Sequence, residues 1–250
     1  MKKIIIANWK CNPIKVKEGE QILLSLKKTI NTENKVIICP PSLFLSPFLS
    51  LFSDIFSFGG QDCFFEEKGA YTGEISPKML QDIGCKYVII GHSERRALFS
   101  ETDKSINQKI SKILNSTKLT PILCIGENRE ERAKNKTYSI LERQITSALN
   151  NISIEKAKKI IIAYEPVWAI GTGVYATKEE IKEAKNNIVK ILCDIYKKLP
   201  PNKIKIIYGG SVDLKNIAFI LNKNDADMDG VLVGGVSLKP KDFSLIANWK

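Results

Sequence analysis

Three side chains suited to proton transfer stand just beyond Ile- and Val-rich runs of the chain: Lys10, His92 and Glu165. A carboxylate in apolar surroundings is a good base, while a neutral imidazole and an ammonium group stabilise an oxyanion. Together they suit proton abstraction beside a carbonyl group, through an enediolate. Each residue also has a purely structural interpretation: a snorkelling surface lysine, a structural or exposed histidine, and a helix-capping glutamate in an ordinary loop.

Two glycine pairs indicate a binding site for a phosphate group. Gly209-Gly210-Ser211 and Gly234-Gly235 each follow an apolar run. Glycines allow backbone N–H groups to approach an anion closely. A single pair usually marks only a turn, but two pairs at the ends of neighbouring predicted strands favour a phosphate site.

Residues 166–173 have the composition of a lid. Pro166 restricts one end, Gly171 and Gly173 loosen the other, and the tip between them is apolar. A segment of this kind closes over a site and excludes water. The chain has neither a Walker motif nor a dinucleotide-binding fingerprint, and no residue pattern in it requires a metal. We therefore expect catalysis on a small phosphorylated substrate without a cofactor.

The elements that must position these residues are strands and helices in alternation. Compact apolar blocks predict parallel strands buried on both faces, and amphipathic stretches such as 15–29 and 100–115 predict helices between them. Thr177 with Glu180 forms a capping-box pattern at the start of another helix. Eight cycles favour a closed barrel over an open sheet. We predict one α/β domain over residues 1–250, a (β/α)8 barrel of eight parallel strands with its active site at their carboxyl ends. The predicted strands are Lys3–Ala7, Lys35–Cys39, Ile55–Gly59, Tyr87–Ile90, Thr120–Ile125, Lys159–Ala163, Ile204–Tyr208 and Gly230–Val233.

The composition argues against several other classes of protein. The chain has 250 residues, of which 44% are hydrophobic and 26% charged, the balance of a globular protein. Apolar runs such as 160–164 are far shorter than the roughly 20 residues of a membrane-spanning helix. The net charge of +11 comes from scattered lysines rather than a basic stripe, so we expect no nucleic-acid partner. The six cysteines stand apart without a CxxC pair, which indicates reduced thiols and a cytoplasmic location.

Several of these segments together closely resemble the triosephosphate isomerase family. Asn8-Trp9-Lys10 matches near the start, and the sequences GHSERR over 91–96 and AYEPVWAIGTG over 163–173 are highly specific. Further matches are GAYTGEIS over 69–76, CIGE over 124–127, YGGSV over 208–212 and residues 230–238. The resemblance runs in order along the whole chain. It implies a TIM barrel that interconverts dihydroxyacetone phosphate and D-glyceraldehyde 3-phosphate in glycolysis and gluconeogenesis.

The resemblance implies a role for each matched residue. Glu165 would move a proton between C1 and C2, while neutral His92 would polarise the carbonyl and exchange protons with the two oxygens. Lys10 would supply positive charge, with Asn8 helping in orientation. The other implied assignments are Glu94 as a supporting carboxylate near Lys10, Ser93 as the group that holds Glu165 in the open state, and backbone N–H groups of Gly171, Ser211, Gly234 and Gly235 as phosphate ligands.

The family is usually a homodimer whose third loop inserts into the partner's site. By resemblance, that loop lies at about 66–75 here, with Thr72 reaching the neighbouring region of Asn8 and Lys10. Oligomerisation would then be a condition of activity.

The sequence departs from the family pattern at three places. Cys11 stands where Met is common, which exposes the expected dimer interface to thiol chemistry. Asp62 stands where Asn is usual and adds a negative charge near that interface. Val174-Tyr175-Ala176 replaces a hinge that often begins with Lys, a change that affects opening and closing of the lid.

Two other functions compete with this interpretation. One is a different phosphate-binding barrel enzyme, either another sugar-phosphate isomerase or a Schiff-base aldolase that uses a lysine. The other is a binding or adhesion role at an anionic surface, supported by the net charge and marked by affinity that falls steeply with salt.

Overall fold

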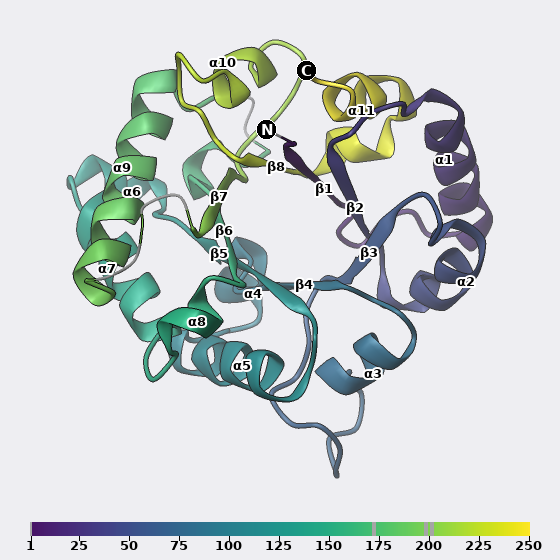
Figure 1. The fold of residues 1–250 in the computed structure, drawn as a ribbon, viewed down its shortest axis with the longest axis horizontal. Coiled ribbons are helices and arrows are strands. Elements are labelled where there is room, and N and C mark those ends of the chain that lie inside the picture. The colour runs from purple at the N-terminus through teal and green to yellow at the C-terminus, as the bar shows by residue number, and fades with distance from the viewer. Residues whose placement is uncertain (1, 172–173, 198–199, 201–202) are drawn as a thin grey trace.

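The apolar blocks of the sequence form parallel strands that close into a barrel (Figure 1). The structure is a computed structural model and describes residues 2–171, 174–197, 200 and 203–250. Within these ranges each of eight strands is hydrogen-bonded to the next, and the eighth pairs with the first. The predicted (β/α)8 barrel is therefore confirmed. The strands are β1 (Ile4–Asn8), β2 (Lys35–Cys39), β3 (Ser57–Gly60), β4 (Tyr87–Ile90), β5 (Thr120–Ile125), β6 (Ile161–Tyr164), β7 (Lys205–Tyr208) and β8 (Gly230–Val233).

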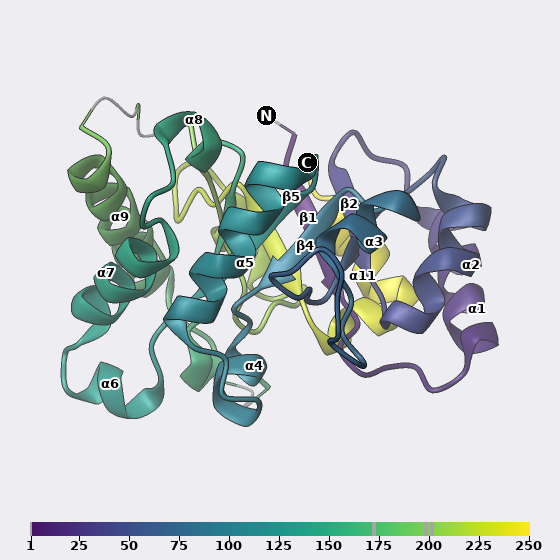
Figure 2. The same ribbon diagram turned by 90° about the horizontal axis from the view of Figure 1, so that it is seen from below.

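Helices surround the barrel, and the two faces of the molecule differ (Figure 2). Both chain ends lie at one face, at the top of Figure 2, while α4 and α6 lie at the opposite face, beyond the carboxyl ends of the strands. The helices are α1 (Val16–Thr29), α2 (Ser42–Phe52), α3 (Pro77–Asp82), α4 (Ser93–Leu98), α5 (Asp103–Ser116), α6 (Arg129–Ala133), α7 (Thr137–Ala148), α8 (Ile154–Ala157), α9 (Lys178–Ile195), α10 (Ile217–Leu221) and α11 (Pro240–Ala247).

The structure confirms the predicted bounds of four strands and corrects the starts of two strands that follow an extra turn at the end of a helix. The strands β2, β4, β5 and β8 have the predicted bounds. The predicted start of β6 at Lys159 is wrong, because the N–H of Lys159 donates to the Lys156 carbonyl and continues the turn after α8. The predicted start of β3 at Ile55 is wrong for the same reason, since Ile55 donates to the carbonyl of Phe52 at the end of α2.

Strand side chains are buried on both faces and form two apolar layers. Alternate residues such as Ile6 and Ile122 fill the inside of the barrel. Their neighbours, such as Ile5 and Leu123, pack outward against the helices. Burial on both faces is why the strands read as continuous apolar runs rather than alternating ones.

Polar side chains define where several helices begin. Thr177 accepts a hydrogen bond from the N–H of Glu180, and the Glu180 carboxylate accepts one from the N–H of Thr177, so the predicted capping box is confirmed. Thr102 caps α5 with Ser105 in the same way, which is why this helix begins at Asp103 and not at the predicted 100.

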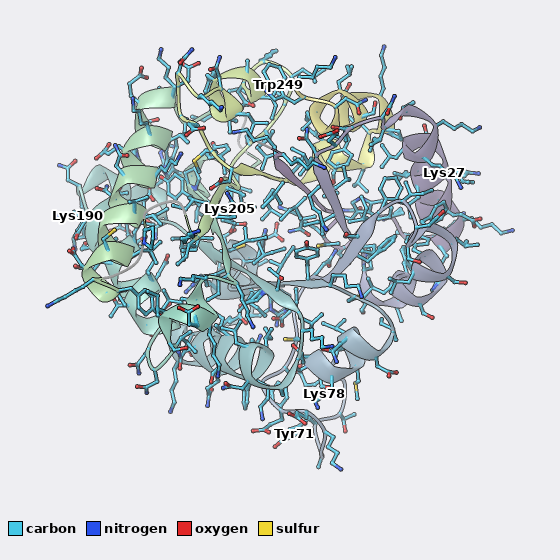
Figure 3. The ribbon with its side chains drawn as sticks, in the orientation of Figure 1. Lys27, Tyr71, Lys78, Lys190, Lys205 and Trp249 are labelled. Atoms are coloured by element: carbon cyan, nitrogen blue, oxygen red, sulfur yellow. The ribbon has the colours of Figure 1, made fainter. Side chains whose placement is uncertain are left out.

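One long connection projects from the barrel. Residues 61–76, between β3 and α3, extend outward, and Tyr71 lies at the tip (Figure 3). A hydrogen bond from the N–H of Phe64 to the carbonyl of Ile75 joins the two arms, and the Phe64 ring packs on that of Tyr71. The loop is therefore an ordered protrusion with Thr72 exposed near its end.

The remaining sequence expectations concern membranes and cysteines. No helix in the described ranges combines the length and the apolar character needed to cross a bilayer. None of the six cysteines, all of which lie in the described ranges, forms a disulfide; Cys11 is exposed, and Cys39, Cys63, Cys85 and Cys124 are buried. Burial raises the pKa of Cys85 to about 12, so its thiol is protonated at neutral pH.

Closure of the barrel makes a testable demand on Gly230. A Cβ atom at this position would lie 1.9 Å from the carbonyl oxygen of Ile4, across the β1–β8 pair that closes the sheet. We expect Gly230→Ala to lower the free energy of unfolding by about 3 kcal/mol, because backbone atoms would have to separate. Urea denaturation at fixed protein concentration measures this. Gly235→Ala is the matched control, since a Cβ there meets nothing within 4 Å. Equal stability of the two variants would contradict the argument.

Candidate active site

The three predicted proton-transfer residues meet in one cavity at the carboxyl ends of the strands. Lys10, His92 and Glu165 come from the ends of β1, β4 and β6, and they line a space of about 430 Å³. A cavity of this size suits a small-molecule ligand. Its other walls include predicted site residues from the ends of β1, β7 and β8 and from the lid segment: Asn8, Gly171, Ser211, Gly234 and Gly235.

Glu165 is held at its backbone and at one of its carboxylate oxygens. The residue is 1% exposed, and its N–H donates to the carbonyl of Ile125 at 2.7 Å. The Oε2 atom accepts a hydrogen bond from the backbone N–H of Ser93 at 3.0 Å. The Oε1 atom has no nitrogen or oxygen donor in hydrogen-bond geometry among the described residues. A buried carboxylate oxygen without a donor has a lone pair available to take up a proton.

His92 faces Glu165 through its Nε2 atom. This nitrogen lies 3.4 Å from Oε1 of Glu165, while Nδ1 accepts a hydrogen bond from the backbone N–H of Glu94 at 3.3 Å. Because Nδ1 acts as an acceptor, a neutral imidazole carries its proton on Nε2. The imidazole therefore presents a hydrogen-bond donor to the cavity.

Lys10 is fixed in an unusual backbone conformation. Its φ angle is 55°, and its N–H donates to Oδ1 of Asn8 at 3.1 Å, while its carbonyl accepts from the side chain of Gln61 at 2.8 Å. The ammonium group pairs with Oε1 of Glu94 at 2.5 Å. Asn8 and Glu94 therefore set the direction of the lysine side chain.

Two turns stiffened by side chains form another part of the cavity wall. The amide of Asn216 donates to the carbonyl of Ser211 at 2.8 Å, and the hydroxyl of Ser237 donates to the carbonyl of Gly234 at 2.6 Å. Lys239 also lines the cavity, and a Cβ at Gly234 would lie 4.0 Å from the ammonium nitrogen of Lys10. Fixed backbone turns next to an ammonium group suit the binding of a phosphate.

Glycine is required where the backbone passes close to Glu165. A Cβ at Gly209 would lie 2.8 Å from Cγ of Glu165, and one at Gly126 would lie 1.8 Å from its carbonyl oxygen. Gly126 is also held by both polar ends of the Gln144 side chain, at 2.8 and 3.1 Å. Gly209, in the predicted phosphate-binding turn, thus also leaves space for the side chain of Glu165.

The start of the lid segment contacts the buried carboxylate of Glu127, a residue of the CIGE match to which the sequence analysis gave no role. Glu127 is fully buried and accepts from the hydroxyl of Tyr164 at 3.1 Å and from the indole N–H of Trp168 at 2.9 Å. Arg132 lies 3.4 Å from the same oxygen and pairs with Glu180 at 2.6 Å. Burial and the Glu127 charge raise the pKa of Tyr164, so it remains a donor. This network joins the start of the lid to the start of α9.

Other predicted residues lie beside the cavity, outside it, or beyond the described ranges. Ser93 and Glu94 contact Glu165 and Lys10. Thr72 is exposed on the projecting loop and does not line the cavity of its own chain. The predicted lid residues Thr172 and Gly173 lie outside the described residues.

Sequence reasoning missed three residues that line the cavity. Lys239 and Asp213 carry no motif, and Tyr175 was noted only as part of an altered hinge. Asp213 and Lys239 follow the glycine turns by a few residues, which was the one signal available for them. The described residues hold no cluster of three or more His, Cys, Asp or Glu that could bind a metal ion.

Comparison with known proteins gives one consistent family. Residues 3–250 match the family model described as Triosephosphate isomerase. The chain is 46% identical to the triosephosphate isomerase of Dictyoglomus thermophilum over 246 residues, which cover 97% of each chain. It is 44% identical to that of Clostridium botulinum over 248 residues, 98% of each chain. It is 42% identical to that of Francisella tularensis subsp. mediasiatica over 249 residues, 99% of this chain and 97% of the relative.

The Glu127 network makes a prediction about stability. Glu127→Ala would leave the hydroxyl of Tyr164 and the indole of Trp168 without their acceptor, so we expect the free energy of unfolding to fall by about 3 kcal/mol. Glu130→Ala is the control, because this neighbouring carboxylate is exposed and its loss should change stability by no more than about 0.5 kcal/mol. Urea denaturation of both variants provides the measurement. A loss for Glu127→Ala as small as that of the control would refute the role of the network.

Proposed function

The chain belongs to the triosephosphate isomerase family, and on this premise we propose that Glu165, His92 and Lys10 carry the proton transfers of its reaction. The chain is an isomerase that interconverts dihydroxyacetone phosphate and D-glyceraldehyde 3-phosphate, a step of glycolysis and gluconeogenesis. The observation that carries the proposal is the buried Glu165 carboxylate, whose free Oε1 lies 3.4 Å from the imidazole in a cavity with glycine turns.

Glu165 acts as the base. Its Oε1 takes a proton from C1 of dihydroxyacetone phosphate, the electrons of that C–H bond form the C1–C2 double bond, and the carbonyl electron pair moves to the oxygen on C2. The resulting enediolate takes the proton back at C2 to give the aldehyde. The free lone pair and the apolar surroundings of Glu165 support this role.

His92 and Lys10 stabilise the oxygens on which charge develops. The Nε2–H of His92 donates to these oxygens and exchanges protons between them, which fits an imidazole whose Nδ1 already accepts from the backbone. The Lys10 ammonium lowers the energy of the enediolate and of the phosphate dianion by its charge. Asn8 and Glu94 hold this lysine in position.

The two turns and the lid bind the phosphate and exclude water. Backbone N–H groups of Gly171, Ser211, Gly234 and Gly235 are the proposed phosphate ligands, supported by their position on the cavity wall. Closure of the lid over the enediolate matters because an exposed enediolate can eliminate phosphate.

We also propose that the protein acts as a homodimer in the cytoplasm. Several large apolar side chains are exposed in the single chain, with Ile14 at 90%, Leu43 at 85% and Phe99 at 66%. Such exposure favours an interface, and Thr72 on the loop would then complete the partner's site near Asn8 and Lys10. Six cysteines that form no disulfide in the described chain support a reducing compartment.

Loss of the base should remove catalysis and leave the scaffold intact. Glu165→Gln keeps the shape of the side chain but cannot take up the proton, so we expect kcat to fall by at least about a thousandfold. The measurement is isomerisation of D-glyceraldehyde 3-phosphate, coupled to reduction of dihydroxyacetone phosphate. Glu155→Gln, at an exposed position on α8, is the control and should keep wild-type turnover. Near-native turnover of Glu165→Gln would remove this residue from the mechanism.

Dilution tests the proposed dimer. If Thr72 of one chain completes the site of the other, activity should disappear as the dimer dissociates, in step with the sedimentation coefficient. The exposed thiol of Cys11 should react with a thiol reagent faster in dilute samples, because dissociation uncovers it. Fully active monomers would contradict a partner-completed site.

A further inference from the structure

The lid segment and the hinge that follows it are both bonded to the same turn after β7. In the lid, the carbonyl of Ala169 accepts a hydrogen bond from the hydroxyl of Ser211 at 2.5 Å. In the hinge, the hydroxyl of Tyr175 donates to Oδ2 of Asp213 at 2.7 Å. Ser211 is a proposed phosphate ligand, and Asp213 follows it by two residues. The turn that holds the phosphate thus also holds the lid.

The acceptor Asp213 is itself firmly positioned. Its Oδ1 accepts a hydrogen bond from the N–H of Lys215 at 2.8 Å, and its own N–H donates to the side chain of Asn216 at 3.0 Å. Asn216 is buried and also donates to the carbonyl of Ser211. Tyr175, by contrast, is 39% exposed, and within the described part of the chain its hydroxyl has a hydrogen bond to Asp213 alone. The partly exposed Tyr175 is therefore tied to a turn that is held by several other hydrogen bonds.

We propose that Tyr175 is a positioning residue for the isomerase reaction, whose hydroxyl holds the hinge after the lid against the phosphate-binding turn through Asp213. This inference rests on the proposed site, because it assumes that the lid covers a phosphate bound at Ser211. Tyr175 and Asp213 both line the cavity, so a change in either acts where the substrate lies.

The same bond controls the charge of Asp213. A carboxylate on the wall of a phosphate site repels the substrate dianion unless its oxygens are directed elsewhere. Here Lys215 and Tyr175 each occupy one oxygen. The hydrogen bond to Asp213 raises the pKa of Tyr175, so the hydroxyl remains a protonated donor at neutral pH. Removing the hydroxyl would loosen the lid and leave one oxygen free to face the phosphate.

Tyr175→Phe tests the proposal, with Tyr196→Phe as the matched control. The Tyr196 hydroxyl makes a hydrogen bond of equal length, 2.7 Å, to the carbonyl of Ile152, far from the cavity. We expect Tyr175→Phe to lower kcat/KM by about threefold to tenfold, the range for one partly exposed hydrogen bond to a carboxylate. Inorganic phosphate released per isomerisation should rise, because a loosened lid exposes the enediolate. The control should change neither quantity.

A double-mutant cycle separates the bond from the charge. Asp213→Ala removes the acceptor and also a negative charge near the phosphate, so its effect alone mixes two opposite changes. In the Asp213→Ala background, Tyr175→Phe should cause no further loss of kcat/KM. Asp213→Asn keeps an acceptor oxygen, so Tyr175→Phe should still lower kcat/KM in that background.

The outcomes are distinct. Unchanged phosphate release in Tyr175→Phe, a faster reaction in that variant, or additive losses in the cycle would each overturn the proposal while leaving the isomerase intact. If the Glu165→Gln variant keeps wild-type activity, the proposed site on which the inference rests is overturned instead.

Discussion

The close approach of three strand ends around the backbone of Glu165 is the constraint on which the rest of the site depends. Its N–H bonds to the end of β5 at Ile125, and the N–H of Gly209 bonds to the preceding carbonyl, at Tyr164. Gly126 and Gly209 have no space for a Cβ beside it. The proposed base is thus positioned by backbone atoms of neighbouring strands.

The buried charges around Asp62 are paired with one another, in contrast to the carboxylate of Glu165. Asp62, the departure from the family pattern, pairs with Lys109 and Arg95 at 2.8 Å each, and Lys109 also contacts Glu101. Burial raises the pKa of Asp62. Burial lowers the pKa of Lys109, but the carboxylates of Asp62 and Glu101 raise that pKa by more. The extra charge is therefore compensated within its own chain. At Glu165 the compensation is incomplete, and the unpaired oxygen is the one that the proposed reaction uses.

Sequence alone predicted what depends on local chemistry and on the barrel's regular geometry. Lys10, His92 and Glu165 were found because residues that follow parallel strands must share one end of the barrel. Strand starts near Ile55 and Lys159 were misplaced because a helix can continue for one more turn without any change in composition. The Glu127 network and the Tyr175–Asp213 bond join segments about 40 residues apart, so no local pattern marks them. Tertiary contacts of this kind can be identified only from the three-dimensional structure.

The site divides its two tasks between two kinds of structure. Proton transfer needs fixed distances, and the strands supply these through backbone bonds that no side-chain substitution can easily replace. Protection of the enediolate needs a segment that opens for substrate, and such a segment cannot be packed as tightly as a strand. Among the described residues, side-chain bonds at Trp168, Ser211 and Tyr175 contribute to its attachment. Glu127 and Asp213, the carboxylates that receive two of these bonds, are themselves held by Tyr164 and Lys215, so the lid and its hinge are attached to groups that the barrel already positions.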